Sequence, residues 1–316
     1  MIASTNVQNL YERWRVSGKR IHGLSLIDKL MLNSLNMCYF VQMQVTFLGT
    51  GAAEGWPAPF CRCPACNSAR KNCGKDIRSR TGALIDGQIK IDFSADTVSQ
   101  LQRHGLDLCD VHSLIFTHEH SDHLVPTELE WIVPPFTNTP MANPIDVYGN
   151  AAVHKVINAA FQDAIPKNLT LRPLLNPFEA VVLVDGTQLL PLAADHVQDA
   201  LLLRVTRPNG KSVFWGHDSG RYPASTVAAL GNAGPVDMAV LDCTFGGQTT
   251  NNRGHLGIDG VIEMVDALRC LDVIVDATTV IATHFSHNGG LLHDQLVDIF
   301  SKHGIQVAYD GVVYEV

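Results

Sequence analysis

The sequence lacks any apolar run long enough to cross a membrane, since no stretch approaches the roughly 18 consecutive apolar residues of a transmembrane helix. It also lacks an excess of basic residues. The net charge of −8 gives no global attraction to phosphate backbones and disfavours large nucleic acids as partners. Low-complexity segments and short repeats are missing, which argues against a solenoid. With 46% hydrophobic and 17% charged residues, the 316-residue chain is expected to fold around a sizeable core.

The first 42 residues differ from the rest because they are net basic in an acidic protein. Apolar residues over 24–35 have loosely helical spacing, but Asp28 and Lys29 interrupt them, so a signal peptide is not expected and the cytoplasm is the expected compartment. A targeting or partner helix is one interpretation. We favour a peripheral or poorly ordered extension over 1–42, because Met43 directly precedes the first clear strand. One domain is then expected over 43–316.

The order of the predicted elements is that of an α/β protein. Hairpins across Asp86-Gly87 and Asp185-Gly186 open the two halves of the chain, and alternating strands and helices follow each of them. This order predicts two sheets packed face to face with helices outside, a four-layer αββα sandwich. The segments 306–308 and 312–316 predict a final hairpin.

Fourteen histidines are many for this length, and three of them lie in one short motif. The motif follows the apolar run 113–116, which predicts a buried strand that feeds a loop at the edge of a sheet. A single histidine near a strand end is usually a satisfied polar residue, but four ligand-type residues in an HxHxDH spacing are rarely incidental. Imidazole and carboxylate groups are ligands of zinc, manganese and iron in hydrolytic sites. The motif is Thr117-His118-Glu119-His120-Ser121-Asp122-His123-Leu124.

Within this motif, His118 and His120 point the same way in an extended chain and can share one ion, whereas Asp122 and His123 can face a second. A two-metal centre needs further ligands from later strand ends. Three apolar runs do end in His or Asp, which makes His196, Asp218 and His284 the candidates. We do not include His217, which is expected to point to the opposite side of an extended chain, or His112, which is expected in the core or at its rim.

This set of motifs resembles the metallo-β-lactamase superfamily over roughly residues 44–316. The resemblance implies the αββα fold and a binuclear centre of zinc or manganese, with iron as a further option. A carboxylate at Asp218 is similar to the phosphodiesterase and thiolesterase branches and departs from true β-lactamases. The implied ligands of one ion are His118, His120 and His196, those of the other are Asp122, His123 and His284, and Asp218 bridges both.

A cysteine cluster makes the chain similar to one group within this superfamily. Clustered cysteines without a secretory leader favour metal ligation over disulfides, the alternative being reduced, unliganded thiols. The segment from Gly49-Thr50-Gly51 through Cys61-Arg62-Cys63-Pro64-Ala65-Cys66 resembles the phosphoribosyl cyclic phosphodiesterases of phosphonate breakdown. In that group three such cysteines and a late histidine hold a structural zinc, which implies Cys61, Cys63, Cys66 and His287 here.

One more histidine follows the segment 241–246. In phosphodiesterase members of the superfamily a histidine of this segment is the general acid, which implies that role for His255 because histidine titrates near neutrality. The plainer interpretation is a solvent-near residue at a helix start. The expected catalytic residues are therefore His255, Asp122 and Asp218.

The expected function is therefore binuclear metal-dependent hydrolysis of a small or cyclic phosphodiester, with two divalent ions in the active site and one structural zinc. No membrane or nucleic-acid partner is expected, and a homodimer stays open. One alternative is a tRNA 3′-processing endonuclease, although the long basic arm of those enzymes has no counterpart between residues 124 and 196. A second alternative is an accessory protein of pyrroloquinoline quinone (PQQ) biosynthesis with the same fold.

Overall fold

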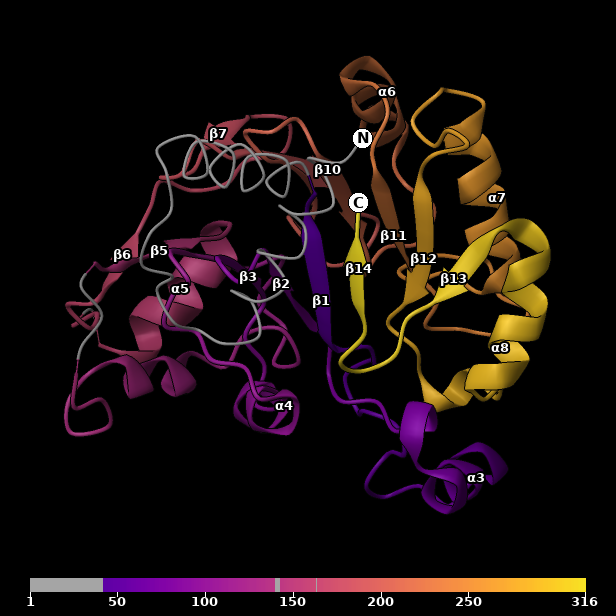
Figure 1. Ribbon diagram of the computed structural model, residues 1–316, viewed down its shortest axis with the longest axis horizontal. Helices are drawn as coiled ribbons and strands as arrows, with labels where there is room; N and C mark the ends of the chain where they lie inside the picture. Colours follow the sequence, from indigo (N-terminus) through magenta and orange to yellow (C-terminus); the bar gives the residue numbers. More distant parts are fainter. Residues whose placement is uncertain (1–41, 140–142, 163) are drawn as a thin grey trace, which may run out of the picture. The chain divides into compact units, whose positions relative to one another are not determined.

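The computed structural model describes residues 42–139, 143–162 and 164–316 (Figure 1). The predicted extension over 1–42 lies outside these residues except for Gln42, so it stays a prediction. Among the described residues, no helix is both long and apolar enough to cross a membrane.

The first sheet has seven strands in the order β14-β1-β2-β3-β4-β5-β6. Antiparallel pairing joins β14, β1, β2 and β3, and parallel pairing joins β3 through β6. The strands are β1 (Gln44–Gly49), β2 (Gly82–Ile85), β3 (Ile89–Ile91), β4 (Ser113–Ile115), β5 (Ile145–Tyr148), β6 (Leu169–Leu171) and β14 (Val313–Glu315).

The second sheet also has seven strands, in the order β13-β12-β11-β10-β9-β8-β7. Its strands β7 to β10 pair antiparallel, whereas β10 to β13 are parallel, so β10, β11 and β12 end at the same edge. The strands are β7 (Val181–Val182), β8 (Gln188–Ala193), β9 (Leu201–Thr206), β10 (Ser212–Gly216), β11 (Met238–Asp242), β12 (Thr279–Thr283) and β13 (Ile305–Val307).

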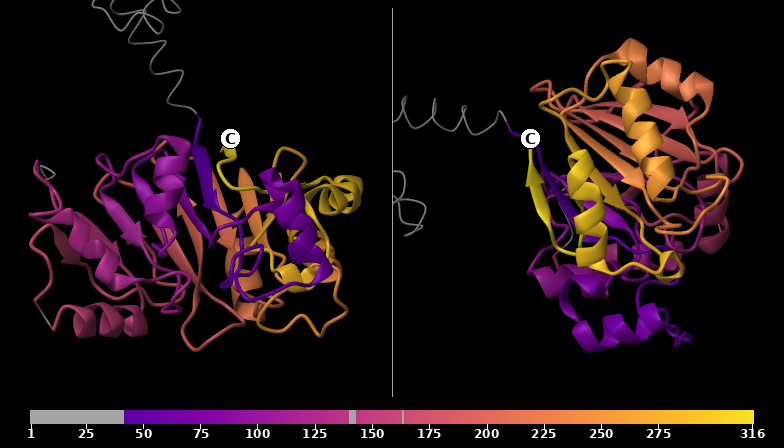
Figure 2. Two further views of the ribbon diagram at one scale, coloured as in Figure 1. Left: turned by 90° about the horizontal axis from the view of Figure 1, so that it is seen from below. Right: turned by 90° about the vertical axis from the view of Figure 1, so that its right-hand side faces the viewer.

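Helices cover the outer faces of the two sheets (Figure 2). Buried apolar side chains of α7 pack with the outer face of the second sheet, and those of α5 and η2 pack with the outer face of the first. The helical segments are α3 (Pro64–Asn72), α4 (Thr97–His104), α5 (Ala151–Ala160), α6 (Ala224–Ala233), α7 (Ile258–Arg269), α8 (His293–Phe300), and the 3-10 turns η1 (Gly74–Asp76), η2 (Pro126–Ile132), η3 (His287–Gly289) and η4 (Ser301–His303).

Successive side chains of a strand face opposite sides of its sheet and so belong to different layers of the core. In β10, Val213 and Trp215 lie in the core between the sheets, whereas Phe214 lies in the core under the helices of the second sheet. In β1, Phe47 faces the inter-sheet core and Leu48 the opposite side. Because both faces are buried, these strands are almost continuously apolar. The predicted αββα sandwich is confirmed.

The predicted hairpin at the end of the chain is wrong. The strand β13 pairs parallel with β12 in the second sheet, whereas β14 pairs antiparallel with β1 in the first. Between them, Asp310 accepts hydrogen bonds from the backbone N–H groups of Thr50 (3.0 Å) and Ser79 (2.7 Å), which fixes the crossover. The two strands are close in sequence, but their partners are distant in sequence, so the local pattern cannot show this pairing.

Candidate metal centre

The ligand-type residues predicted from the sequence do meet at the ends of strands from both sheets. The HxHxDH loop follows β4, and His196 follows β8. Asp218 and His284 follow β10 and β12, whose parallel course brings their carboxyl ends to one edge. The Leu201 N–H at the start of β9 donates to the Thr117 carbonyl at 3.0 Å, which ties the second sheet to the loop.

Three imidazoles form the first cluster. One nitrogen each of His118, His120 and His196 lies within 4.8 Å of the other two. His196 Nε2 lies 3.3 Å from His120 Nδ1. His118 is fully buried, and its Nε2 has no hydrogen-bond partner in the described part of the chain. Three imidazoles that converge in this way, one of them buried and with an unpartnered nitrogen, fit a divalent metal ion.

The second cluster is built around one carboxylate oxygen. Asp218 Oδ2 lies 2.7 Å from His123 Nε2 and 3.2 Å from His284 Nε2. Its other oxygen, Oδ1, lies 3.9 Å from His196 Nε2 in the first cluster. Asp122 completes the second cluster, with Oδ2 at 3.2 Å from His123 Nε2. Asp218 therefore lies between the two groups, as expected for a bridging carboxylate.

Hydrogen bonds on the far side of three rings orient them for metal binding. The Nδ1 of His123 faces Asp92 Oδ2 at 2.7 Å, and that of His196 faces the Gly254 carbonyl at 3.1 Å. The Nδ1 of His284 lies 2.8 Å from Thr244 Oγ1, a hydroxyl that can itself donate to the His284 carbonyl. A proton on each Nδ1 leaves each Nε2 lone pair directed toward the cluster, the usual arrangement around ligating histidines.

Two buried aspartates, Asp92 and Asp242, support the centre from outside, and the sequence analysis missed both. Asp92 also accepts from the Thr117 N–H at 2.9 Å. Asp242 accepts from the backbone N–H groups of Asp218 (3.1 Å) and Leu256 (3.0 Å) and lies 3.0 Å from His255 Nδ1. The signal was present, because Asp92 follows β3 and Asp242 ends β11. Each carboxylate comes at the end of a buried strand, as Asp218 does, although Lys90 interrupts the apolar residues before Asp92.

Three non-glycine residues at these strand ends have left-handed backbone. The φ angles are 54° at Asp92, 53° at Asp218 and 60° at His284. Left-handed conformation is uncommon outside glycine, although Asp and His adopt it more readily than most residues, and it concentrates at functional sites. The turn that follows each strand directs Asp218 and His284 into the centre and Asp92 against the far side of His123.

The expectation for His217 is wrong. The structure places its buried ring inside the second cluster, with Nδ1 at 3.3 Å from Asp218 Oδ2 and ring centroids 5.3 Å from His123. The alternation rule assumed an extended chain, whereas the left-handed φ at Asp218 breaks that geometry. His112 was correctly excluded, because it lies outside both clusters and contacts Ser113 and Asp185.

The charged groups of the cluster shift the pKa values of one another. Burial lowers the pKa of an imidazole, but Asp218 and Asp92 raise the pKa of His123 well above its ordinary value. Burial raises the pKa of Asp218, but His284 and His123 hold it well below its ordinary value. The pKa of Asp122 is likewise lowered, mainly by His123, against the effect of burial. For His118, burial lowers the pKa, so it is a neutral potential ligand.

His255 lies beside both clusters, just before α7. Its ring centroid is 4.9 Å from that of His196, and its ring stacks on His284 at 5.7 Å. Burial lowers the pKa of His255, but Asp242 and Asp218 raise it to about 9. The side chain keeps 22% of its surface exposed, so it borders both the buried clusters and solvent.

The predicted structural zinc ligands also come together. One donor atom each of Cys61, Cys63, Cys66 and His287 lies within 4.8 Å of the others, and all three cysteines are free. Cys63 Sγ lies 3.5 Å from His287 Nδ1. The Cys66 N–H bonds to Cys63 Sγ and lowers the pKa of Cys63 to about 6, whereas burial raises that of Cys66 to about 12. A Cys₃His set is a closed tetrahedral set suited to zinc.

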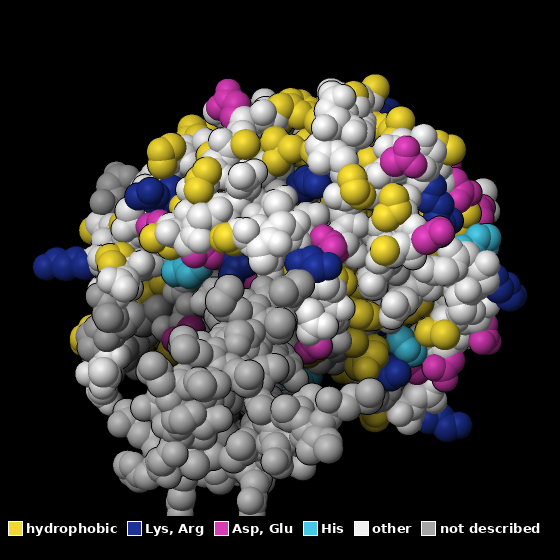
Figure 3. Space-filling model, turned by 45° about the horizontal axis from the view of Figure 1, so that its top comes forward, with side chains coloured by type: hydrophobic (Ala, Val, Ile, Leu, Met, Phe, Trp, Pro, Cys, Tyr) yellow, Lys and Arg dark blue, Asp and Glu magenta, His cyan; other side chains and the backbone are white. Residues whose placement is uncertain are grey.

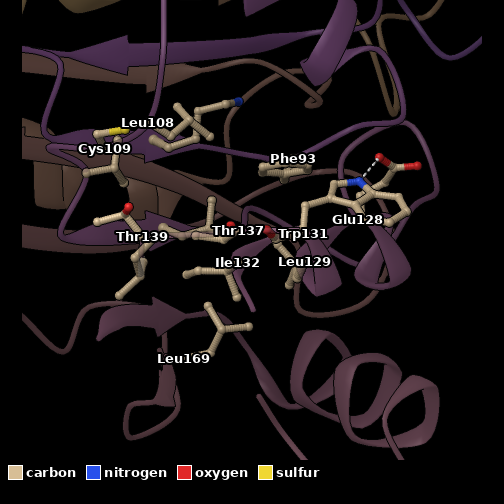
Figure 4. A pocket seen from close by; sticks show the side chains of 14 residues that line it. Phe93, Leu108, Cys109, Glu128, Leu129, Trp131, Ile132, Thr137, Thr139 and Leu169 are labelled. Atoms are coloured by element: carbon tan, nitrogen blue, oxygen red, sulfur yellow. Dashed lines mark hydrogen bonds between the residues drawn. The ribbon is translucent and has the colours of Figure 1, made fainter. Parts of the chain in front are cut away.

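A separate cavity of about 230 Å³ lies on the outer face of the first sheet (Figure 4). Side chains of Phe93, Leu129, Trp131 and Ile132 line it, together with Lys90. Its lining includes none of the residues of either histidine cluster, so we do not assign the reaction to it.

Comparisons with known proteins identify the family of the chain. Residues 88–285 match the Beta-lactamase superfamily domain. Coenzyme PQQ synthesis protein B of Cupriavidus necator is 24% identical over 306 residues, which cover 85% of this chain and 98% of that protein.

Two solved structures share the fold. A diphosphatase from the PhnP family has a TM-score of 0.67 at 22% identity, covering 87% of this chain and 98% of its own. Zn²⁺-bound PqqB from Methylobacterium extorquens has a TM-score of 0.69 at 16% identity, covering 86% of this chain and 100% of its own. The chain therefore belongs to the metallo-β-lactamase superfamily, whose members are mostly hydrolases, and it resembles the PhnP family within it.

Proposed function

We propose that the protein is a binuclear metal-dependent hydrolase that cleaves a small or cyclic phosphodiester. The observation that carries the proposal is the position of Asp218, with one oxygen toward each of two clusters of ligand-type side chains. In this proposal Asp218 would offer one oxygen to each of two divalent ions. His118, His120 and His196 would hold one ion, and Asp122, His123 and His284 would hold the other. A structural zinc would be held by Cys61, Cys63, Cys66 and His287.

When bound, the two ions supply a water of lowered pKa and neutralise charge on the phosphoryl oxygens. The chain supplies the rest. Asp92 and Thr244 hold two ligating rings in the required tautomer. Asp122 and Asp218 provide carboxylate oxygens that can orient the nucleophilic water.

His255 is the proposed proton donor to the leaving oxygen. Its Nδ1 is held by Asp242 at 3.0 Å, which leaves Nε2 free to face a substrate. The negative charge of Asp242 raises the pKa of His255, which favours the protonated ring that a proton donor needs. A general acid of this kind typically contributes about 10²- to 10⁴-fold to a rate.

The test uses two substrates that differ in leaving group. His255→Asn should lower kcat strongly for a cyclic ribosyl phosphate, whose alkoxide leaving group needs a proton, and much less for bis(p-nitrophenyl) phosphate. Asp218→Ala should abolish the turnover of both. His112→Asn, outside the clusters, is the matched control and should change neither. Full activity of Asp218→Ala would refute the proposal, and an equal loss on both substrates would remove His255 as the acid.

A second function is favoured by the relative from Cupriavidus necator, which matches over 98% of its length and is a coenzyme PQQ synthesis protein. On this alternative the chain serves cofactor biosynthesis and binds metal without hydrolysing phosphodiesters. The same assays distinguish the two, because metal-loaded wild-type protein would then turn over neither substrate. A role in tRNA processing gains no comparable support. The face shown in Figure 3 does not favour RNA binding, because its acidic and basic side chains are interspersed.

A further inference from the structure

His217 is a buried histidine whose surroundings leave its polar atoms unsatisfied. Only 1% of its surface is exposed. Neither ring nitrogen has a hydrogen-bond partner among the residues that the structure describes. Such buried polar atoms are rare in folded proteins, and a bound metal ion is one of the partners that would satisfy them.

The neighbours of His217 on the side of the centre are all ligand-type groups. Its Nδ1 lies 3.3 Å from Asp218 Oδ2, the oxygen that also faces His123 and His284. One donor atom of each of these four residues lies within 4.8 Å of the other three. Two atoms that bind one ion at about 2.1 Å each are at most about 4.2 Å apart, so the four atoms need little movement to share an ion.

A purely structural role explains the position less well. The other nitrogen, Nε2, lies 3.7 Å from Asp92 Oδ2, which is too long for a hydrogen bond, and that oxygen already accepts from His123 at 2.7 Å. Behind the ring, Trp215 packs edge-on at 5.2 Å between centroids and holds it toward the cluster.

We propose that His217 is an additional ligand of the second metal ion, beside Asp122, His123, Asp218 and His284. The inference rests on the proposed binuclear centre and adds a third imidazole to its second half. Imidazole suits zinc and iron better than manganese or magnesium, which prefer oxygen ligands. His217 therefore tunes the second site toward zinc or iron.

The variant test measures metal binding rather than turnover. Wild-type protein, His217→Gln and the control His293→Gln are freed of metal, reloaded with Zn²⁺ or Mn²⁺, and analysed by elemental analysis and chelator competition. His293 is a suitable control because it is also a buried histidine but bonds to Arg78, outside both clusters. We expect His217→Gln to weaken one zinc ion of the centre at least 10-fold, to weaken manganese clearly less, and to change the visible spectrum of the Co²⁺-loaded protein. The control should match wild type.

A crystal structure of the zinc-loaded wild-type protein provides a test that needs no variant. A His217 nitrogen at about 2.0–2.1 Å from the second ion supports the inference, and a nitrogen farther than about 3 Å overturns it. Wild-type zinc affinity and cobalt spectrum in His217→Gln would also overturn it, and the proposed function would still stand. If the wild-type protein bound only the zinc of the cysteine site, both the inference and the proposed function would fail.

Discussion

The buried amine of Lys90 should make the stability of the protein depend on pH. It lies on β3 and is fully buried, and its Nζ donates to the carbonyls of Ile91 (3.1 Å) and Asp92. The contact with the Asp92 carbonyl links this amine to the residue that orients His123. Burial lowers the pKa of Lys90 from 10.5 to about 7, although Asp92 acts in the opposite direction.

The sign follows from proton linkage. Between pH 7 and 10.5 the unfolded chain keeps the lysine proton and the folded chain has lost it. The free energy of unfolding therefore rises with pH in this window, and this gain is lost again as the pH falls back to 7. Each pH unit with a full proton difference corresponds to about 1.36 kcal/mol. Since the folded protein is half protonated at pH 7 and the unfolded chain begins to deprotonate near pH 9.5, the gain between these two values is about 3 kcal/mol.

The assay compares wild-type protein with Lys90→Met by urea denaturation at pH 7, 8, 9 and 9.5, with metal kept in excess. Differences between the two proteins cancel the pH dependence of metal binding. The stability of wild type relative to Lys90→Met should rise by about 3 kcal/mol across the series. Lys71→Met, at an exposed lysine, is the control and should give a flat difference. A flat difference for Lys90→Met as well would contradict this prediction, because the buried amine would then titrate as it does in the unfolded chain.

Two further predictions concern the supports of the centre. Asp242→Asn removes the charge that holds His255, so kcat on a cyclic ribosyl phosphate should fall about 10²- to 10⁴-fold in steady-state kinetics. The double variant with His255→Asn should be no slower than either single variant. An additive loss would separate the two residues. Cys63→Ala should cost one zinc ion per chain by elemental analysis and lower the Tm by several degrees, with the binuclear centre still loaded; an unchanged zinc content would exclude the cysteine site.

The parts of the site that depend on local spacing could be predicted from the sequence. The HxHxDH motif places four ligand-type residues within six positions, so no long-range fold is needed to bring them together. His196, Asp218 and His284 could be predicted because an apolar strand that ends in a polar ligand is a local pattern. The alternating elements likewise predicted the αββα layers, because burial on one or both faces of a strand appears directly in the order of apolar residues.

The other features of the site and the fold could not be predicted, because they depend on contacts between residues far apart in sequence or on the backbone conformation of a single residue. The left-handed φ at Asp218 turned His217 into the cluster, against the rule for an extended strand. Asp92 and Asp242 became supports of the centre only when the fold brought their carboxylates beside His123 and His255. The strands β13 and β14 belong to different sheets because each pairs with a strand far away in sequence, and a pattern read along the chain carries no record of that pairing.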